Sequence, residues 1–149
     1  MTHEFEQWED AVIGALEPLR DSGLKTLEPY ADQLNAEEVA QVTVRFPAIY
    51  VTAGNLRITE RNRYDSKVLG ITLIVCDKNV RGSMAATRGD VSSPGVFELL
   101  RLSRAALHRT KILANWTPPS CKSEQCWAFS PADGLCLYAA VYEVATVGH

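Results

Sequence analysis

The first patterned segment of the chain has apolar side chains at helical spacing. Phe5, Trp8, Val12, Leu16 and Leu19 follow one another at intervals of three or four residues, with acidic residues on the other faces. Pro18 disfavours the helical conformation for the residue before it, so the helix should end or kink at Glu17. The pattern therefore predicts an amphipathic helix that lies on the surface of a core.

Two later segments have the pattern of strands. Residues 47–53 alternate, with Ile49, Val51 and Ala53 on one face, and we expect residues 54–55 to stop this strand. Residues 68–76 are apolar on both faces, which is typical of a strand in the middle of a sheet. Residues 57–66 read as a polar, basic excursion between the two strands.

The remaining segments are predicted from turn residues and shorter patterns. A short strand within residues 21–29 and a helix over 36–40, capped by Asn35, are possible. Residues 77–94 read as a loop with a brief helical turn near Met84. An amphipathic helix is predicted over 96–107, a second loop over 115–124, and a hairpin of strands 126–129 and 135–147.

This order of elements predicts an α+β fold. A largely antiparallel or mixed sheet of four to five strands should carry helices packed on it. The length of 149 residues is most simply one domain, residues 1–149. No apolar run approaches the roughly 18 residues of a membrane span, and the acidic start is unlike a secretory signal. We therefore expect a cytosolic protein that does not enter a membrane.

Charge is distributed unevenly along the chain. Residues 1–44 hold ten acidic and two basic side chains, whereas residues 78–111 hold seven basic and two acidic ones. Ordinary surface charge accounts for such a split. An alternative is that the two segments attract each other in a head-to-tail contact between subunits, which closes into a ring when the rotation allows.

No set of residues predicts catalysis. His3, His108 and His149 have no Asp or Ser partner at a known spacing, and the glycine-rich segment near Gly89 matches no phosphate or dinucleotide motif. We therefore expect neither an enzyme nor a cofactor. Cys121, Cys126 and Cys136 could form part of a zinc site or a disulfide, but their spacing favours reduced structural cysteines, and we predict no metal.

A stripe of basic residues follows one face of the helix predicted over 96–107. Its members are spaced by three, four and three residues: Arg101, Arg104, His108 and Lys111. The stripe can be a solvated face, a contact with an acidic neighbouring subunit, or a contact with DNA phosphates. The acidic net charge of −3 and the lack of interleaved aromatic residues disfavour DNA.

Four short motifs resemble, in their order, the Mu-like phage and prophage tail terminator family. They are Arg45-Phe46-Pro47-Ala48, Asn79-Val80-Arg81-Gly82, Arg88-Gly89-Asp90 and Gly95-Val96-Phe97-Glu98-Leu99-Leu100. Each motif alone is weak, and Phe97 stands where the family often has Tyr. The likeness extends over roughly residues 5 to 147.

The resemblance implies a virion structural protein that caps the tail tube and joins it to the head-completion or connector proteins. Such a protein would form a hexameric ring of copies of itself and bind the tail tube protein, in the host cytoplasm during assembly and then in the virion tail. We expect subunit contacts from both charged segments, at Arg81, Arg88, Asp90, Arg101, Arg104, His108, Glu9 and Asp10. A nucleic-acid-binding or regulatory module that uses the Arg101 and Arg104 helix face is the alternative.

Overall fold

The computed structural model describes residues 2–31, 45–78, 83–89, 94–130 and 134–147. The elements are α1 (Glu4–Leu16), the 3₁₀ helix η1 (Glu17–Ser22), β1 (Thr26–Pro29), β2 (Ala48–Glu60), β3 (Asp65–Lys78), α3 (Ser83–Arg88), α4 (Gly95–Leu107), β4 (Ser120–Ser130) and β5 (Leu135–Ala145). Five strands form one sheet in the order β1-β2-β3-β5-β4. Only β1 pairs in parallel, so the sheet is mixed and the predicted α+β class is confirmed.

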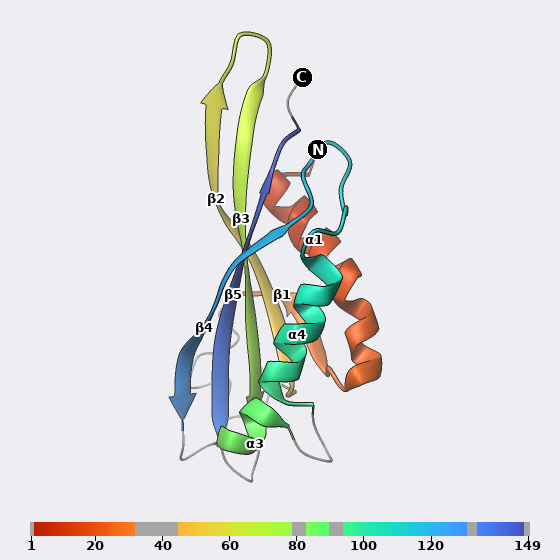
Figure 1. Ribbon diagram of the computed structural model, residues 1–149, viewed down its shortest axis with the longest axis vertical. Coiled ribbons are helices and arrows are strands. Elements are labelled where there is room, and N and C mark those ends of the chain that lie inside the picture. The colour runs from red at the N-terminus through yellow and green to blue at the C-terminus, as the bar shows by residue number, and fades with distance from the viewer. Residues whose placement is uncertain (1, 32–44, 79–82, 90–93, 131–133, 148–149) are drawn as a thin grey trace.

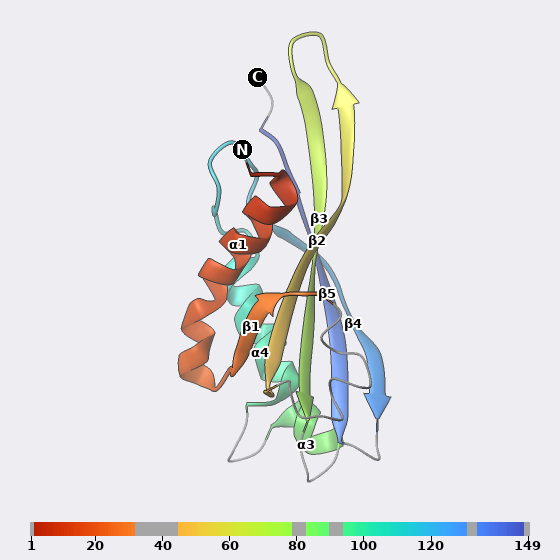
Figure 2. The same cartoon turned by 180° about the vertical axis from the view of Figure 1, so that it is seen from behind.

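The described helices cover one face of this sheet. Figures 1 and 2 show α1 and α4 side by side on that face, with α3 near the N-terminal end of α4. The main core lies between the two layers and contains Trp8 and Leu16 of α1, Leu73 of β3 and Leu99 of α4, none of them accessible to solvent. Trp8 also meets Trp116 edge to face at a centroid distance of 5.8 Å. The predicted helix faces are therefore confirmed.

The first helix ends where its sequence predicts. The α-helical part stops at Leu16, and Pro18 lies in the first turn of the 3₁₀ helix that follows. Gly23 then closes η1 with a left-handed φ of 108°, a conformation that favours glycine. The short strand β1 follows directly, as the sequence allowed.

The prediction that Gly54 and Asn55 stop the second strand is wrong. β2 continues to Glu60, and its register with β3 shifts between Gly54 and Leu56. Asn55 absorbs the extra residue in the left-handed region, with φ 64°. The segment read as an excursion, residues 57–66, is therefore the far end of the β2–β3 hairpin.

The loop predicted over 115–124 is also partly wrong. β4 begins at Ser120, which pairs with Glu143 of β5. This part of β4 has few apolar residues because it lies at the sheet edge, so its strand character comes from pairing with β5. The helical turn near Met84 is α3. The helix predicted over 36–40 lies outside the described residues.

Candidate assembly surfaces

Arg101 and Arg104 of the basic stripe point outward from α4, as predicted, whereas His108 and Lys111 lie beyond the end of the helix at Leu107. All four side chains contact other groups of the chain. Arg101 forms an ion pair with Glu98 one turn earlier on the same helix. This guanidinium lowers the pKa of the Glu98 carboxyl. The side chain of Arg101 keeps 63% of its accessible surface, so the pair lies in water and is available to a partner.

The rest of the stripe joins α4 to the second half of the chain. Arg104 lies 3.2 Å from the carboxylate of Glu124 on β4. His108 accepts a hydrogen bond of 2.9 Å at Nδ1 from the backbone N–H of Cys121. Lys111 donates to the carbonyl of Trp116. The first two contacts hold the edge strand β4 against the helix layer, and the third lies within the segment between α4 and β4.

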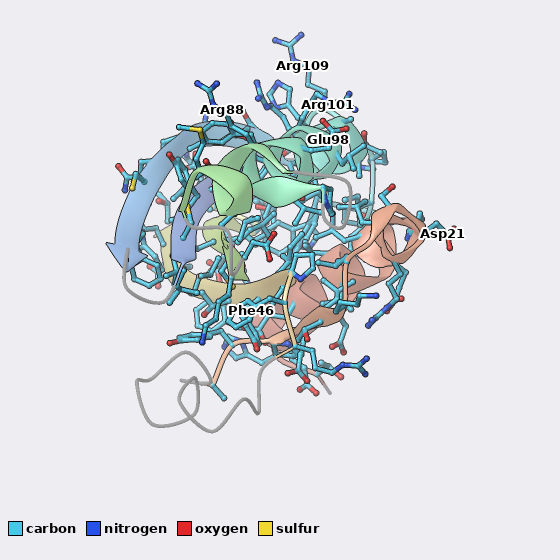
Figure 3. The ribbon with its side chains drawn as sticks, turned by 90° about the horizontal axis from the view of Figure 1, so that it is seen from below. Asp21, Phe46, Arg88, Glu98, Arg101 and Arg109 are labelled. Atoms are coloured by element: carbon cyan, nitrogen blue, oxygen red, sulfur yellow. The ribbon has the colours of Figure 1, made fainter. Side chains whose placement is uncertain are left out.

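Two further arginines extend the outward basic surface. Arg88, at the end of α3, and Arg109, just after α4, are exposed, and the ion pairs among the described residues include neither. Figure 3 shows Arg88, Arg101 and Arg109 on one side of the molecule, with Asp21 on another. Arg81 and Asp90, the other two predicted interface residues of this region, lie outside the described residues.

The two predicted acidic residues of α1 have different environments. Glu9 is half-buried and accepts a hydrogen bond of 2.9 Å from the backbone N–H of Ala53 on β2. Asp10 is exposed. Sequence spacing placed both residues on the polar side of the helix but could not separate these environments, because the partner of Glu9 lies 44 residues away.

An exposed stripe of four acidic residues and one glycine follows α1 and enters η1, where the exposed Arg20 lies one 3₁₀ turn after Glu17. Its residues are spaced by four, four, three and four positions and are all exposed: Glu6, Asp10, Gly14, Glu17 and Asp21. We call this stripe the acidic face. Glu17 forms an exposed ion pair with Arg20, and the ion pairs of the described chain leave the other three carboxylates without a cation.

The far end of the β2–β3 hairpin projects beyond the rest of the sheet. β5 pairs with β3 only from Val68 onward, and we call residues 57–66 the arm. Thr59 and Glu60 pair with Ser66 and Asp65 next to the turn, whereas Arg57 and Ile58 pair with Val68 and Lys67 at the base. Figure 1 shows the arm extending past the N-terminal end of α1. Its tip carries Arg61 and Arg63, and Ile58 is 56% exposed. In the sequence, residues 57–66 have only a polar, basic composition, which gives no indication of an exposed hairpin.

The strand β4 forms one edge of the sheet. Its register with β5 shifts at Lys122 and at Trp127, which interrupts the free edge with two bulges. Trp127 is 56% exposed at the second bulge, beside the exposed Cys126. Tryptophan is enriched among the residues that contribute most to binding at protein interfaces.

The cysteines are free thiols in contrasting environments. Cys76 and Cys136 are buried, and desolvation raises the pKa of both, to about 12 for Cys136. The described residues contain no group of three or more His, Cys, Asp or Glu side chains arranged to hold a metal ion.

None of the described helices has the length and apolar character needed to cross a bilayer.

The sequence profile of the family described as Bacteriophage Mu, Gp37 matches residues 4–118. This range covers most of the chain, including α1, the β2–β3 hairpin and α4, and the chain belongs to that family. The predicted likeness to a Mu-like phage family is thereby confirmed, and membership supports a structural or assembly role in such a phage. The search of curated proteins gave no match.

Proposed function

We propose that this protein is a non-enzymatic tail terminator, which caps the tail tube and joins it to head-completion proteins. Family membership supports a phage role. The observation that carries the finer role is the separation of charge in one monomer, with Arg88, Arg101 and Arg109 on one side and the acidic face of α1 and η1 on another. Two different complementary surfaces on one chain are what a closed ring of identical subunits requires.

The proposed partners are further copies of the chain, the tail tube protein and the head-completion proteins. A ring would present one flat side to the last ring of tube protein and the other to the head. The exposed Trp127 on the edge strand and Met84 on α3, both outside the core, are candidates for these stacking contacts.

Removing the gene from an inducible Mu-like prophage tests the role. We expect induced cells without the protein to accumulate tail tubes of uncontrolled length and free heads in electron micrographs. Expression of the chain from a plasmid should restore tails of uniform length attached to heads. Uniform, attached tails in the deletion strain would contradict the proposal.

The alternative, a nucleic-acid-binding or regulatory module, would use the Arg101 and Arg104 helix face, beside which Arg88 and Arg109 are also exposed. A phosphate on the central part of this surface would have to compete with Glu98 for Arg101 and with Glu124 for Arg104. We therefore expect no shift of duplex DNA by the purified protein at moderate salt. A shift that weakens steeply with added salt would support the alternative.

A further inference from the structure

The start of β4 is held to the end of α4 by an imidazole. β4 is an edge strand whose neighbour in the described sheet is β5, and the N–H of Cys121 near its start donates to Nδ1 of His108 at 2.9 Å. The backbone on either side of this contact is also fixed. The N–H of His108 donates to the carbonyl of Arg104, and the N–H of Arg109 donates to the carbonyl of Pro119. The half-buried ring is therefore held where it accepts a backbone N–H of the edge strand.

This hydrogen bond defines the protonation state of the ring. An imidazole nitrogen accepts an N–H only when it carries no proton, so the proton of the neutral His108 ring lies on Nε2. A protonated imidazole has N–H groups at both nitrogens and accepts at neither. Protonation of His108 therefore removes the contact and turns two N–H groups toward each other.

The charged and titratable groups around the ring come from each element that packs there. They are Arg104 on α4, Arg109 and Lys111 after it, Cys121, Lys122 and Glu124 on β4, and Tyr142 on β5. Desolvation raises the pKa of the Cys121 thiol and of the Tyr142 hydroxyl, so both stay neutral below pH 8. The carboxylate of Glu124 is held by Arg104 at 3.2 Å.

Histidine is the side chain that ordinarily changes its charge between about pH 5 and pH 8. The arginines and lysines around His108 keep their charge over this range. A fall in pH through this range therefore acts at this site through the imidazole, because only the neutral ring can accept the N–H of Cys121.

We propose that His108 is a pH-sensitive switch that controls the start of β4. With the neutral ring the switch is closed, and the N–H of Cys121 is bonded. With the protonated ring it is open, and this N–H becomes accessible to water or to another molecule. The switch lies within one monomer, so it does not depend on the terminator role proposed above.

The opening is local. Pro119 stays bonded to the N–H of Arg109, and Ser123 and the residues after it stay paired with β5. The ion pair of Arg104 with Glu124 also remains, but the side chain of Arg104 is 51% exposed, so water screens this pair. The residue released is Cys121, whose thiol is half-buried against the main core. The switch therefore also controls access to this thiol.

Nuclear magnetic resonance of the protein labelled with ¹⁵N tests the switch. At pH 7.5 we expect a scalar coupling across the hydrogen bond between the amide nitrogen of Cys121 and Nδ1 of His108. The coupling should vanish at pH 5, and the amide proton of Cys121 should move upfield with the same midpoint as the His108 ring. Absence of the coupling at pH 7.5, or an amide that does not follow the ring, would overturn the switch.

Two substitutions of nearly equal shape isolate the hydrogen bond. His108→Asn keeps an acceptor oxygen at every pH, whereas His108→Leu has none. At pH 7.5 the amide proton of Cys121 should exchange with solvent about three- to tenfold faster in the leucine variant than in the asparagine variant. In the unaltered chain its protection should fall by the same factor between pH 7.5 and pH 5, after correction for the intrinsic rate. Equal exchange in the two variants would show that the hydrogen bond is not the cause.

A thiol reagent gives a second readout at a single pH. At pH 7.5 Cys121 should be labelled about three- to tenfold faster in His108→Leu than in His108→Asn, because opening exposes the thiol. The exposed Cys126 is the internal control and should react equally in both variants. Equal labelling of Cys121 in both would contradict control of the thiol by His108.

His3 provides the background control. Its Nδ1 accepts the N–H of Phe5 at 3.0 Å at the start of α1, so its protonation also removes a hydrogen bond. His3→Asn keeps a capping acceptor at every pH and should leave the response of Cys121 unchanged. If that response disappears in the His3→Asn variant, its assignment to His108 is wrong.

Discussion

The carboxylate of Glu9 on α1 accepts a hydrogen bond of 2.9 Å from the backbone N–H of Ala53, at the edge of β2. The neighbouring strand β1 ends at Pro29, opposite Val51, and among the described residues no strand continues along this edge to accept the N–H of Ala53. The carboxylate of Glu9 accepts the hydrogen bond that a neighbouring strand would otherwise accept, two residues before the bulge at Asn55. The contact therefore fixes α1 against the sheet where the arm begins to diverge.

Glu9→Ala should lower the free energy of unfolding by about 1–2 kcal/mol, because it leaves the N–H of Ala53 without its charged acceptor. Glu9→Gln keeps an acceptor oxygen and should cost less. Urea unfolding followed by circular dichroism measures both. The neighbouring exposed change Asp10→Ala is the control and should stay within about 0.5 kcal/mol of the unaltered chain. Equal costs at the two positions would contradict a structural role for Glu9.

The ion pair between Glu4 and Lys67 should make stability depend on pH. The hydrogen bond from Lys67 lowers the pKa of Glu4 below its ordinary value of 4.5, so the folded state favours the charged carboxylate. The stabilisation is thus present above the unfolded-state pKa and is lost as the pH falls through the lowered folded-state value. Glu4→Gln should cost about 0.5–1 kcal/mol at pH 7 and progressively less in acid.

Unfolding curves of the Glu4→Gln variant and the unaltered chain, collected from pH 7 down to pH 3, measure this difference. Glu6→Gln, an exposed neighbour outside the described ion pairs, is the matched control and should show a smaller effect at pH 7. A difference between Glu4→Gln and the unaltered chain that is constant over the whole range would show that the ion pair is not responsible.

The two arginines of the α4 stripe should differ in their effect on stability. Arg104→Ala removes the cation beside Glu124, whose side chain is only 21% exposed, and should cost about 1 kcal/mol. Arg101→Ala removes an exposed pair within one helix and should cost less than about 0.5 kcal/mol. Thermal unfolding of both variants tests the order. If this order holds, a charge reversal aimed at the proposed subunit contacts belongs at Arg101 and Arg109, because reversal at Arg104 would also break the contact with Glu124.

The thiols should react in a sequence set by burial. Cys126 is exposed and should react quickly with a thiol reagent in the native protein at pH 8. Cys76 and Cys136 should be protected, because both are buried and their raised pKa values leave almost no thiolate. The half-buried Cys121, whose pKa is also raised, should react slowly. Mass spectrometry of the labelled peptides, before and after unfolding, identifies each site, and rapid labelling of Cys136 in the folded protein would contradict the predicted order.

Local pattern in the sequence determined the elements and their inward faces. Trp8 and Leu16 recur at the helical period and Leu73 lies in a continuous apolar run, and each is buried as predicted. The outward placement of Arg101 and Arg104 followed from the same period. These features could be predicted because the spacing of neighbouring residues fixes which side of a helix or strand they share.

Tertiary structure decided the features that depend on distant segments. The partners of Arg104 and His108 come from β4, whose first residues have the polar composition of a loop and form a strand only by pairing with β5. Likewise, β2 continues through Asn55 because β3 lies beside it, and Glu9 turns inward because Ala53 offers an N–H there. The sequence alone determined periodicity and charge, whereas pairing over long separations decided which charges form contacts within the fold and which stay exposed.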